Sequence, residues 1–287
     1  MRFRIAYSAE YTYSEPVRDN LNVVRVKPAT TAWQALEDFK LRVDPEARLH
    51  QHRDYFGSEV NEFGIVEPHD RLAIEARMHV ETSVREQVPQ GSWDRAATAE
   101  YRQAAGEFML PTEARPANGE LDRLLEAARA ETPLGTALAL SEAIPERFEY
   151  RAGSTFVGST VADLLEVRAG VCQDFVHLGL MLLRELGIGA RYVSGFLFAA
   201  PEDGGRDSVE VQTHAWLEVL VPEEGERVWV GIDPTNRGRT RETHVKIGHG
   251  RHYQDVPPIR GVYQGPATTE LETGVEMRRL NGEGAAA

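Results

Sequence analysis

The most informative segment of the chain is Arg168-Ala169-Gly170-Val171-Cys172-Gln173-Asp174-Phe175, which places the sole cysteine directly after a glycine turn. Apolar residues at helical spacing follow and predict a helix from about Cys172 to Leu186. The free N–H groups and the dipole at a helix N-terminus stabilise a thiolate and can also hold an oxyanion. A cysteine that only fills a core would more naturally lie in the middle of the helix. Position alone therefore leaves both a nucleophile and a core cysteine open.

The regions on either side of this segment predict an α+β fold. Apolar residues at helical spacing predict helices over 120–130 and 134–148, and Thr160 and Asp163 form a loose capping box at the start of another. Strand-like runs follow at 190–198, 211–221 and 227–232. Helices followed by consecutive strands are typical of a layered α+β domain.

Four parts of the chain are expected from the change in pattern along the sequence. Short strand-like runs over residues 1–88 predict a β-rich N-terminal domain, and Pro-, Gly- and Ala-rich residues 89–118 predict a linker with a short helical piece. Residues 119–265 form the expected core. Residues 266–287 lack periodicity and are expected to be a flexible C-terminal tail.

Composition excludes several classes of function. The 287 residues are 41% hydrophobic and 27% charged, with a net charge of −13. This balance argues against non-specific nucleic-acid binding and against binding to an anionic membrane surface. No run approaches the roughly 18 apolar residues of a membrane span. The N-terminus lacks the apolar run of a signal peptide, and one cysteine allows no internal disulfide, so we expect a cytoplasmic protein.

A cysteine nucleophile requires a base, and His214 is the better candidate. His177 is nearer in sequence, but five helical residues turn it about 140° away from Cys172; we expect a structural role for it. His214 lies in a strand whose alternation places His214, Trp216 and Glu218 on one face, which suits the floor of a cleft. On its own, His214 could equally be a histidine on an exposed sheet face.

A third residue could orient the histidine. Asp233 ends the next predicted strand, and the loop of residues 222–226 is short enough for an antiparallel hairpin. Because adjacent strands lie about 4.8 Å apart, the Asp233 carboxylate could bind the His214 imidazole. Alone, Asp233 could be a turn former at a strand end. The three residues together make the stronger case.

These residues and their neighbours resemble the transglutaminase-like superfamily, most closely the bacterial branch with a β-rich N-terminal region before a papain-like core. The matching segments are 170–175, Thr213-His214-Ala215-Trp216, 231–236 and 255–263, with Tyr11-Thr12-Tyr13-Ser14-Glu15-Pro16-Val17 near the start. The order Cys, His, Asp is that of the family. The resemblance covers roughly residues 1–265.

The resemblance implies a Cys172–His214–Asp233 triad and thiol-dependent acyl transfer or hydrolysis at peptide or glutamine-type amide bonds. The expected enzyme is a cysteine peptidase, deamidase or transglutaminase that acts on a peptide or protein substrate. Gln173 and Trp216 are candidates for the oxyanion site and the cleft wall, although Gln173 points about 100° away from Cys172 on a helix. No cofactor and no obligatory calcium are expected. A homo-oligomer is left open.

Two departures from the family pattern concern His252, where this branch is expected to have an acidic residue, and Val171, where animal transglutaminases have glutamine.

Two other classes of function compete with the enzyme hypothesis. One is a catalytically silent scaffold of the same fold that binds peptides or a partner; the intact Cys-His-Asp set argues against it. The other is a metal-dependent hydrolase that uses the pairs His50/His52 and His249/His252. Neither pair has the helical spacing of a zinc protease. The sequence also lacks the Gly-x-Ser-x-Gly segment of serine hydrolases and the glycine-rich phosphate loops.

Overall fold

One long strand organises the N-terminal region. In the computed structural model, which describes residues 1–199, 209–211, 213–223, 225 and 228–280, β1 spans Arg2–Val24. Its side chains alternate, with Phe3, Ile5 and Tyr7 buried and Arg4 exposed. Because successive strand residues point to opposite faces, β1 offers one apolar face to the protein and one polar face to solvent.

The sheet around β1 has eight strands. The first half of β1 pairs with two antiparallel neighbours, β5 (His69–Thr82) and β15 (Thr269–Leu280). Its second half pairs with β4 (Glu59–Ile65) and β14 (Ile259–Gln264). The remaining strands are β2 (Gln34–Asp44), β3 (His50–Arg53) and β9 (Val209–Val211).

A second sheet forms the centre of the molecule. Its strand order is β12-β11-β10-β8-β13, and neighbouring strands are antiparallel. These strands span β8 (Ala190–Leu197), β10 (Thr213–Val221), β11 (Val228–Asp233), β12 (Gly238–Arg239) and β13 (His244–Gly250). A small parallel pair, β6 (Glu149–Tyr150) and β7 (Ala169–Gly170), lies beside it.

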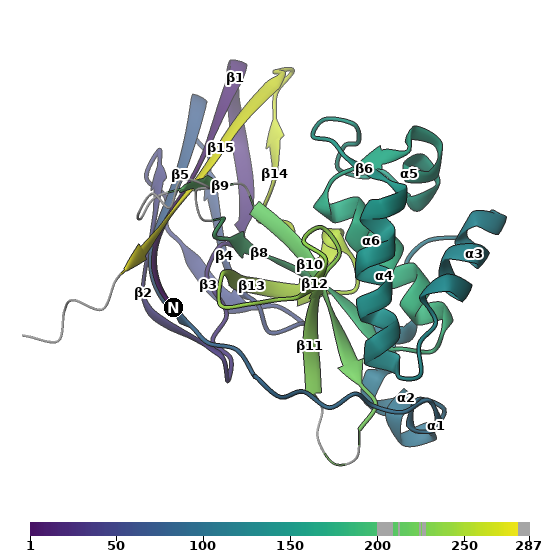
Figure 1. The fold of residues 1–287 in the computed structure, drawn as a ribbon. Helices are drawn as coiled ribbons and strands as arrows, with labels where there is room; N and C mark the ends of the chain where they lie inside the picture. Colours follow the sequence, from purple (N-terminus) through teal and green to yellow (C-terminus); the bar gives the residue numbers. More distant parts are fainter. Residues whose placement is uncertain (200–208, 212, 224, 226–227, 281–287) are drawn as a thin grey trace, which may run out of the picture.

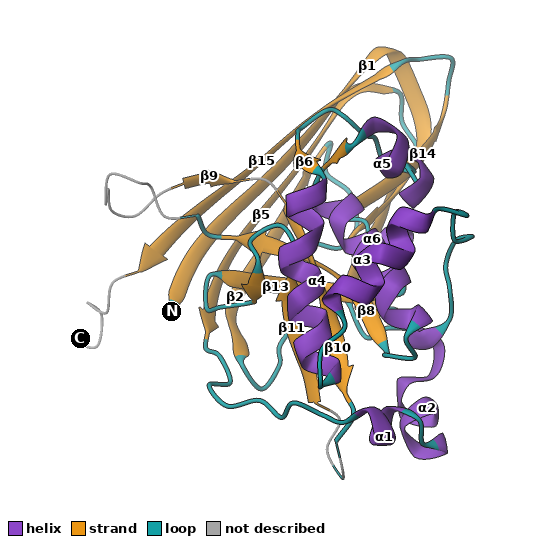
Figure 2. Ribbon diagram, turned by 45° about the vertical axis from the view of Figure 1, so that its right-hand side comes forward, coloured by secondary structure: helices purple, strands orange, loops and turns teal. Residues whose placement is uncertain are grey.

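Four helices form a layer on one face of the central sheet (Figures 1 and 2). They are α3 (Gly119–Ala128), α4 (Pro133–Arg147), α5 (Val161–Val167) and α6 (Cys172–Glu185). In this layer α4 and α6 lie against the strands, α3 packs on α4 and α5 packs on α6. The predicted capping box of Thr160 and Asp163 is present at the start of α5. No helix among the described residues is both long and apolar enough to cross a membrane.

The opposite face of the central sheet packs on the N-terminal sheet. Phe196, Phe198, Val245 and Ile247 of the central sheet share a buried apolar cluster with β1 and β5, and the rings of Phe3 and Phe198 lie 5.3 Å apart. The molecule therefore has three layers: an outer sheet, a central sheet and helices. The predicted α+β class with a β-rich N-terminal part is confirmed.

The predicted linker over 89–118 contains three short helical pieces: α1 (Trp93–Ala96), α2 (Ala99–Ala105) and the 3₁₀ turn η1 (Gly106–Met109). It is anchored to the core, because the Tyr101 hydroxyl donates to Leu220 O and accepts from Gly189 N. A second 3₁₀ turn, η2, spans Tyr253–Asp255.

The expected flexible tail is wrong for most of its length. Thr269–Leu280 form β15, which pairs with β1 from Tyr13↔Thr269 to Arg2↔Leu280 and buries Val275 and Met277. Most other β15 side chains are polar or charged and face solvent, so the segment has little apolar periodicity of its own. Its partner strand lies at the other end of the chain, and local pattern cannot detect such pairing. Residues 281–287 of the predicted tail lie outside the described part.

The expected boundary at residue 265 also differs from the structure. β14 falls within the expected core of residues 119–265, yet it pairs with β1 in the outer sheet, as β15 does. The outer sheet is therefore completed by strands that follow the core in sequence.

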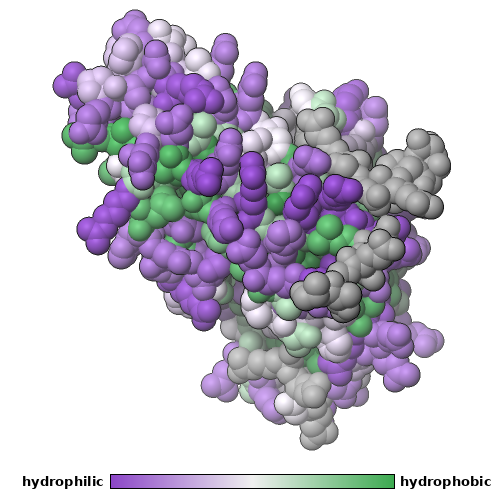
Figure 3. Space-filling model, turned by 90° about the vertical axis from the view of Figure 1, so that its left-hand side faces the viewer, coloured by the Kyte–Doolittle hydropathy of each residue, from purple (hydrophilic) through white to green (hydrophobic). Residues whose placement is uncertain are grey.

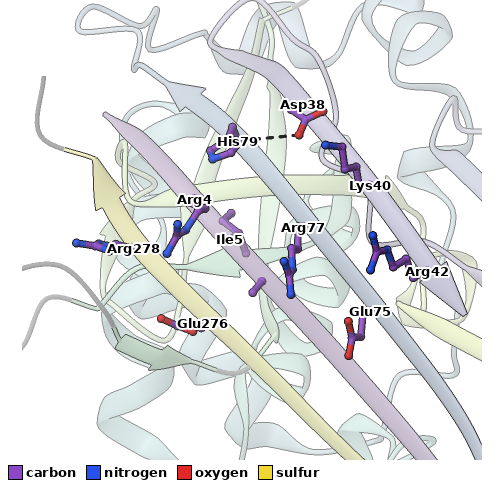
Figure 4. A pocket seen from close by; sticks show the side chains of 11 residues that line it. Arg4, Ile5, Asp38, Lys40, Arg42, Glu75, Arg77, His79, Glu276 and Arg278 are labelled. Carbon is purple, nitrogen blue, oxygen red and sulfur yellow. Dashed lines mark ion pairs between the residues drawn. The ribbon is translucent and has the colours of Figure 1, made fainter. Parts of the chain in front are cut away.

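The solvent face of the outer sheet is mainly hydrophilic (Figure 3). A shallow hollow of about 560 Å³ on it is lined by side chains from β1, β2, β5 and β15. Exposed Arg4, Lys40, Arg77 and Arg278 lie there among Asp38, Glu75 and Glu276 (Figure 4). Lys40 and Arg77 are direct cross-strand partners.

Candidate functional site

Cys172 is the first residue of α6, as predicted, and its side chain is partly exposed. The helix starts abruptly because Asp174 Oδ2 accepts hydrogen bonds from Val171 N (2.8 Å) and from Thr155 Oγ1 (2.6 Å). Residue 170, two positions before Cys172, has to be a glycine, since a Cβ there would lie 2.9 Å from the Asp174 carboxylate. Asp174 thus caps the helix, while Arg168 pairs with Glu120 at 2.7 Å.

His214 lies at the start of β10 and Asp233 at the end of β11, the neighbouring antiparallel strand. His214 Nε2 lies 2.8 Å from Asp233 Oδ2, and both side chains are buried. The Cys172 thiol lies near enough to His214 to contribute to the raised pKa of its imidazole. Because Asp233 occupies Nε2, Nδ1 is the nitrogen left for the thiol. The three residues proposed as a triad are therefore brought together.

The charge state of this group follows from its hydrogen bonds. Burial alone would lower the pKa of His214, but the hydrogen bonds and charges of Asp233 and Cys172 raise it to about 9. Burial would raise the pKa of Asp233, whereas hydrogen bonds from His214 and His244 hold it well below its usual range. At neutral pH the buried pair is an imidazolium next to a carboxylate.

Asp233 is fully hydrogen-bonded. Its Oδ2 accepts from His214, from Asn236 Nδ2 (2.7 Å) and from His244 Nε2 (3.0 Å). Its Oδ1 accepts from the backbone N–H groups of Thr235 (2.9 Å) and Asn236 (3.1 Å). The carboxylate is thus held rigidly in position, which suits a group that orients an imidazole.

His244 is the residue that sequence reasoning missed. Its Nδ1 accepts a hydrogen bond from Arg241 N at 3.1 Å, so its proton lies on Nε2 and is donated to Asp233. His244 is therefore a neutral donor that helps to hold the carboxylate. No local pattern around residue 244 signals this role, because β13 reaches Asp233 only through the fold of the sheet.

The two secondary candidates have different surroundings. Trp216 is 2% exposed; its ring lies 6.2 Å from that of His214 and meets His244 edge-to-face at 5.3 Å. It packs over Gly195, where a Cβ would clash with its ring. Trp216 is therefore a packed aromatic beneath the two histidines, and its part in a cleft wall stays a prediction. Gln173 is partly exposed beside Cys172, and its part in an oxyanion site stays a prediction.

Exposed apolar side chains lie close to the thiol. Tyr150 pairs with Gly170, two residues before Cys172, and is 52% exposed. Phe156 and Val157 are 75% and 66% exposed and directly follow Thr155, which is bound to Asp174 at the helix start. Such side chains could contact the residues that flank a scissile amide.

The histidine pairs of the metal hypothesis do not form metal sites with one another. His50 and His52 are partly exposed neighbours on β3, with ring centres 6.0 Å apart. His252 instead stacks at 4.0 Å on His177, which is buried as expected, while His249 packs against Phe56 and Phe108.

Two other groups of potential ligands come together among the described residues: His214/Asp233/His244 and Glu113/His177/His252. In the first group, the ring nitrogens of His214 and His244 already form hydrogen bonds with the Asp233 carboxylate. In the second, His177 Nε2 and His252 Nδ1 accept from Tyr253 N and Gln254 N, both at 3.4 Å, so their other nitrogens carry the protons. Neither arrangement suits a metal ion without rearrangement.

Comparison with known proteins agrees with the fold and the motif. Residues 3–81 match the model of the bacterial transglutaminase-like N-terminal region, and residues 123–234 match that of the transglutaminase-like superfamily core. A protein of Mycobacterium leprae, "Uncharacterized protein ML0607", is 31% identical over 97% of this chain and 99% of its own length.

Two further proteins carry more descriptive names. A protein-glutamine gamma-glutamyltransferase of Pseudomonas aeruginosa is 29% identical over 45% of this chain and 19% of its own. The crystal structure of a "putative cysteine protease" from Cytophaga hutchinsonii superposes with a TM-score of 0.71 at 23% identity, covering 96% of this chain and 90% of that one. The structural similarity to the Cytophaga protein establishes the shared fold.

Proposed function

We propose that this chain, which belongs to the transglutaminase-like superfamily, catalyses thiol-dependent acyl transfer or hydrolysis at peptide or glutamine-type amide bonds, with Cys172 as nucleophile. The observation that carries the proposal is that Cys172, at the start of α6, lies near His214, whose imidazole is hydrogen-bonded to Asp233. It supplies the nucleophile, the base and the orienting carboxylate of a thiol triad.

The proposed reaction assigns each proton to a named atom. The Cys172 thiolate attacks the amide carbonyl, and the His214 imidazolium gives its Nδ1 proton to the leaving nitrogen as the C–N bond breaks. Neutral His214 then takes a proton from water or from an acceptor amine, which attacks the thioester and releases the thiolate. Asp233 keeps Nε2 protonated throughout.

The start of α6 offers the means to stabilise the oxyanion. The Cys172 N–H has no helical carbonyl partner and points out of the helix, where the dipole also favours negative charge. Gln173 is our candidate for a second donor. The exposed Tyr150, Phe156 and Val157 favour a peptide with apolar side chains beside the reacting amide.

The acyl acceptor is the part of the proposal that an assay must decide. The Pseudomonas relative is named as a glutamyltransferase and the Cytophaga structure as a protease, so both outcomes are represented among similar proteins. The chain has only three lysines, Lys27, Lys40 and Lys246, which argues against self-crosslinking as its purpose.

The first test is the pH dependence of iodoacetamide alkylation, because Cys172 is the only thiol. We expect wild type to react rapidly at pH 6 and His214→Ala to react much more slowly, since the mutant lacks the imidazolium that stabilises the thiolate. Mass spectrometry of the labelled protein gives the rate. Equal rates in the two proteins would contradict the proposal and favour a peptide-binding scaffold of the same fold.

The second test is turnover. Wild type and Cys172→Ala are incubated with glutamine-containing peptides in the presence and absence of a primary amine. Ammonia release, amine incorporation and peptide cleavage separate the three reaction types. Activity that survives in Cys172→Ala would contradict the proposed nucleophile.

A further inference from the structure

A cavity of about 400 Å³ lies between the two sheets, on the face of the central sheet that the helices do not cover. Its floor is built by side chains of β8, β10, β11 and β13. Residues 31–34 and 83–85 of the N-terminal region close it from the other side. Its volume is typical of a small-molecule site, and neither Cys172 nor His214 is among its lining residues.

The floor of this cavity carries more buried positive charge than negative charge. Arg191 and Lys246 both bind Glu218, each at 2.6 Å. The three side chains are only 13%, 11% and 14% exposed. One carboxylate therefore balances one of two buried cations, and a buried charge without a counter-charge is costly.

The pKa values of the residues in this cluster reflect its excess of positive charge. Burial and the neighbouring Arg191 lower the pKa of Lys246 to about 8, although Glu218 acts in the opposite direction. Burial would raise the pKa of Glu218, but the two cations hold it well below its usual range. His249, which faces the same cluster, has its pKa lowered to about 3 by burial and by Lys246 and Arg191, and is neutral.

Further cations line the rim. The Arg239 guanidinium donates to the carbonyl oxygens of Arg85 and Glu86, at 2.6 and 3.4 Å, and to no carboxylate among the described residues. The Arg241 side chain is exposed and forms no ion pair within the described part of the chain. In the described lining, Glu218 is the single carboxylate.

The walls are aromatic. Trp33, Trp216 and Trp229 line the cavity, and they are three of the four tryptophans in the chain. The Arg191 guanidinium lies 3.9 Å from the Trp229 ring centre, so that ring already presents a face to a planar group. Cations next to flat apolar walls match a ligand that combines an anionic group with an apolar body.

We propose that this cavity binds a small organic anion, a carboxylate with an aromatic or other flat apolar body. The carboxylate would lie against Lys246 and Arg191, and the body against the tryptophan rings. The hollow on the outer sheet (Figure 4) is a weaker candidate, because its cations are exposed to water and interleaved with three carboxylates.

The test compares 2-naphthoate with its neutral analogue 2-naphthamide on the full chain. Binding is measured by tryptophan fluorescence and by calorimetry. We expect saturable binding of the carboxylate and at least about tenfold weaker binding of the amide, because the charged hydrogen bonds are lost. Equal binding of the two, or no carboxylate binding at millimolar concentration, would overturn the proposal.

Three variants locate the site. Lys246→Met keeps the Arg191–Glu218 pair and should weaken carboxylate binding about tenfold or more. Arg241→Met at the exposed rim should weaken it less and cannot disturb the core, so it keeps the test valid if Lys246→Met misfolds. Arg77→Met in the outer hollow is the matched control. Unchanged affinity in both cavity variants, or an equal loss in Arg77→Met, would overturn the assignment.

Discussion

Asp233 and Glu218 are two buried carboxylates on adjacent strands of the same sheet, and their surroundings differ in one respect. Asp233 is bound by two histidines, His214 and His244, and by the amide of Asn236. Glu218 is bound by two cations, Arg191 and Lys246. In both cases neighbours hold the pKa of the carboxyl below its usual range.

This difference separates the proposed catalytic carboxylate, Asp233, from the charged group around Glu218. Around Asp233 the positive charge is on His214, which can release its proton, so the assembly stays close to neutral as a proton moves. Around Glu218 two cations face one carboxylate below pH 8, so the cluster keeps an excess of positive charge there. The first arrangement suits catalysis, and the second suits the binding of an anion.

The largest expected effect is that of Asp233→Asn on rate. The amide keeps the shape of the carboxylate but cannot hold the proton of His214 on Nε2, and we expect turnover to fall about ten-thousandfold. Steady-state kinetics of the purified variant measure this, with circular dichroism as the control for folding. A rate within tenfold of wild type would remove Asp233 from the triad.

Unlike Asp233→Asn, Glu218→Gln should mainly lower the stability of the protein. Removing the carboxylate leaves Arg191 and Lys246 buried together without a counter-charge, at a cost of about 3–5 kcal/mol in the free energy of unfolding. Urea denaturation gives that value. The double variant Glu218→Gln/Lys246→Met is the control and should recover part of the loss; no recovery would contradict the charge argument.

His244 should have an intermediate effect on rate. His244→Ala removes one hydrogen bond to the charged Asp233, and we expect kcat to fall about 10- to 100-fold. KM should change little, and the alkaline limb of the pH profile should move to higher pH, because Asp233 with one donor fewer binds the His214 proton more tightly. His244→Gln, which can still donate, should restore part of the rate. A uniform loss in both variants would indicate a packing role only.

The two clusters should respond oppositely to alkaline pH. The folded pKa of His214, about 9, exceeds its ordinary value of 6.5, so its contribution to stability is complete below pH 6.5 and is lost as pH rises through 9. The folded pKa of Lys246, about 8, is below its ordinary 10.5, so its cost is relieved as pH rises from 8 to 10.5.

Unfolding free energies of wild type, His214→Phe and Lys246→Met between pH 6 and 10 test this. The difference between wild type and His214→Phe should shrink as pH rises towards 9. Above pH 8, the free energy of unfolding of wild type should rise relative to that of Lys246→Met. Parallel curves for all three proteins would contradict both assignments.

The smallest effect is expected on the outer sheet. Arg77 lies directly opposite Lys40, and like charges in that position are destabilising. Arg77→Met should therefore raise the free energy of unfolding by a few tenths of a kcal/mol and leave turnover unchanged. Thermal denaturation and the turnover assay check this. A loss above about 1 kcal/mol would show that the cations there are not simply solvated.

The sequence predicts the grouping of the candidate site residues better than the assembly of the two sheets. Cys172, His214 and Asp233 could be placed together because each lies at or near the end of a local element, and the sequence predicts a short hairpin loop between the last two strands. His244 and the Arg191–Glu218–Lys246 cluster could not, since they meet only where β8, β10 and β13 pair across the sheet.

The pairing of β1 with β15 has a consequence for how the protein is made. During synthesis β1 leaves the ribosome before the other strands of the outer sheet that the structure describes, and β15 follows only after residues 119–265. Until then one edge of β1 presents unpaired backbone groups, which are a template for misassociation between nascent chains. Because β15 closes this edge of β1, a polypeptide truncated before Thr269 would carry Cys172 and His214 but remain prone to aggregate.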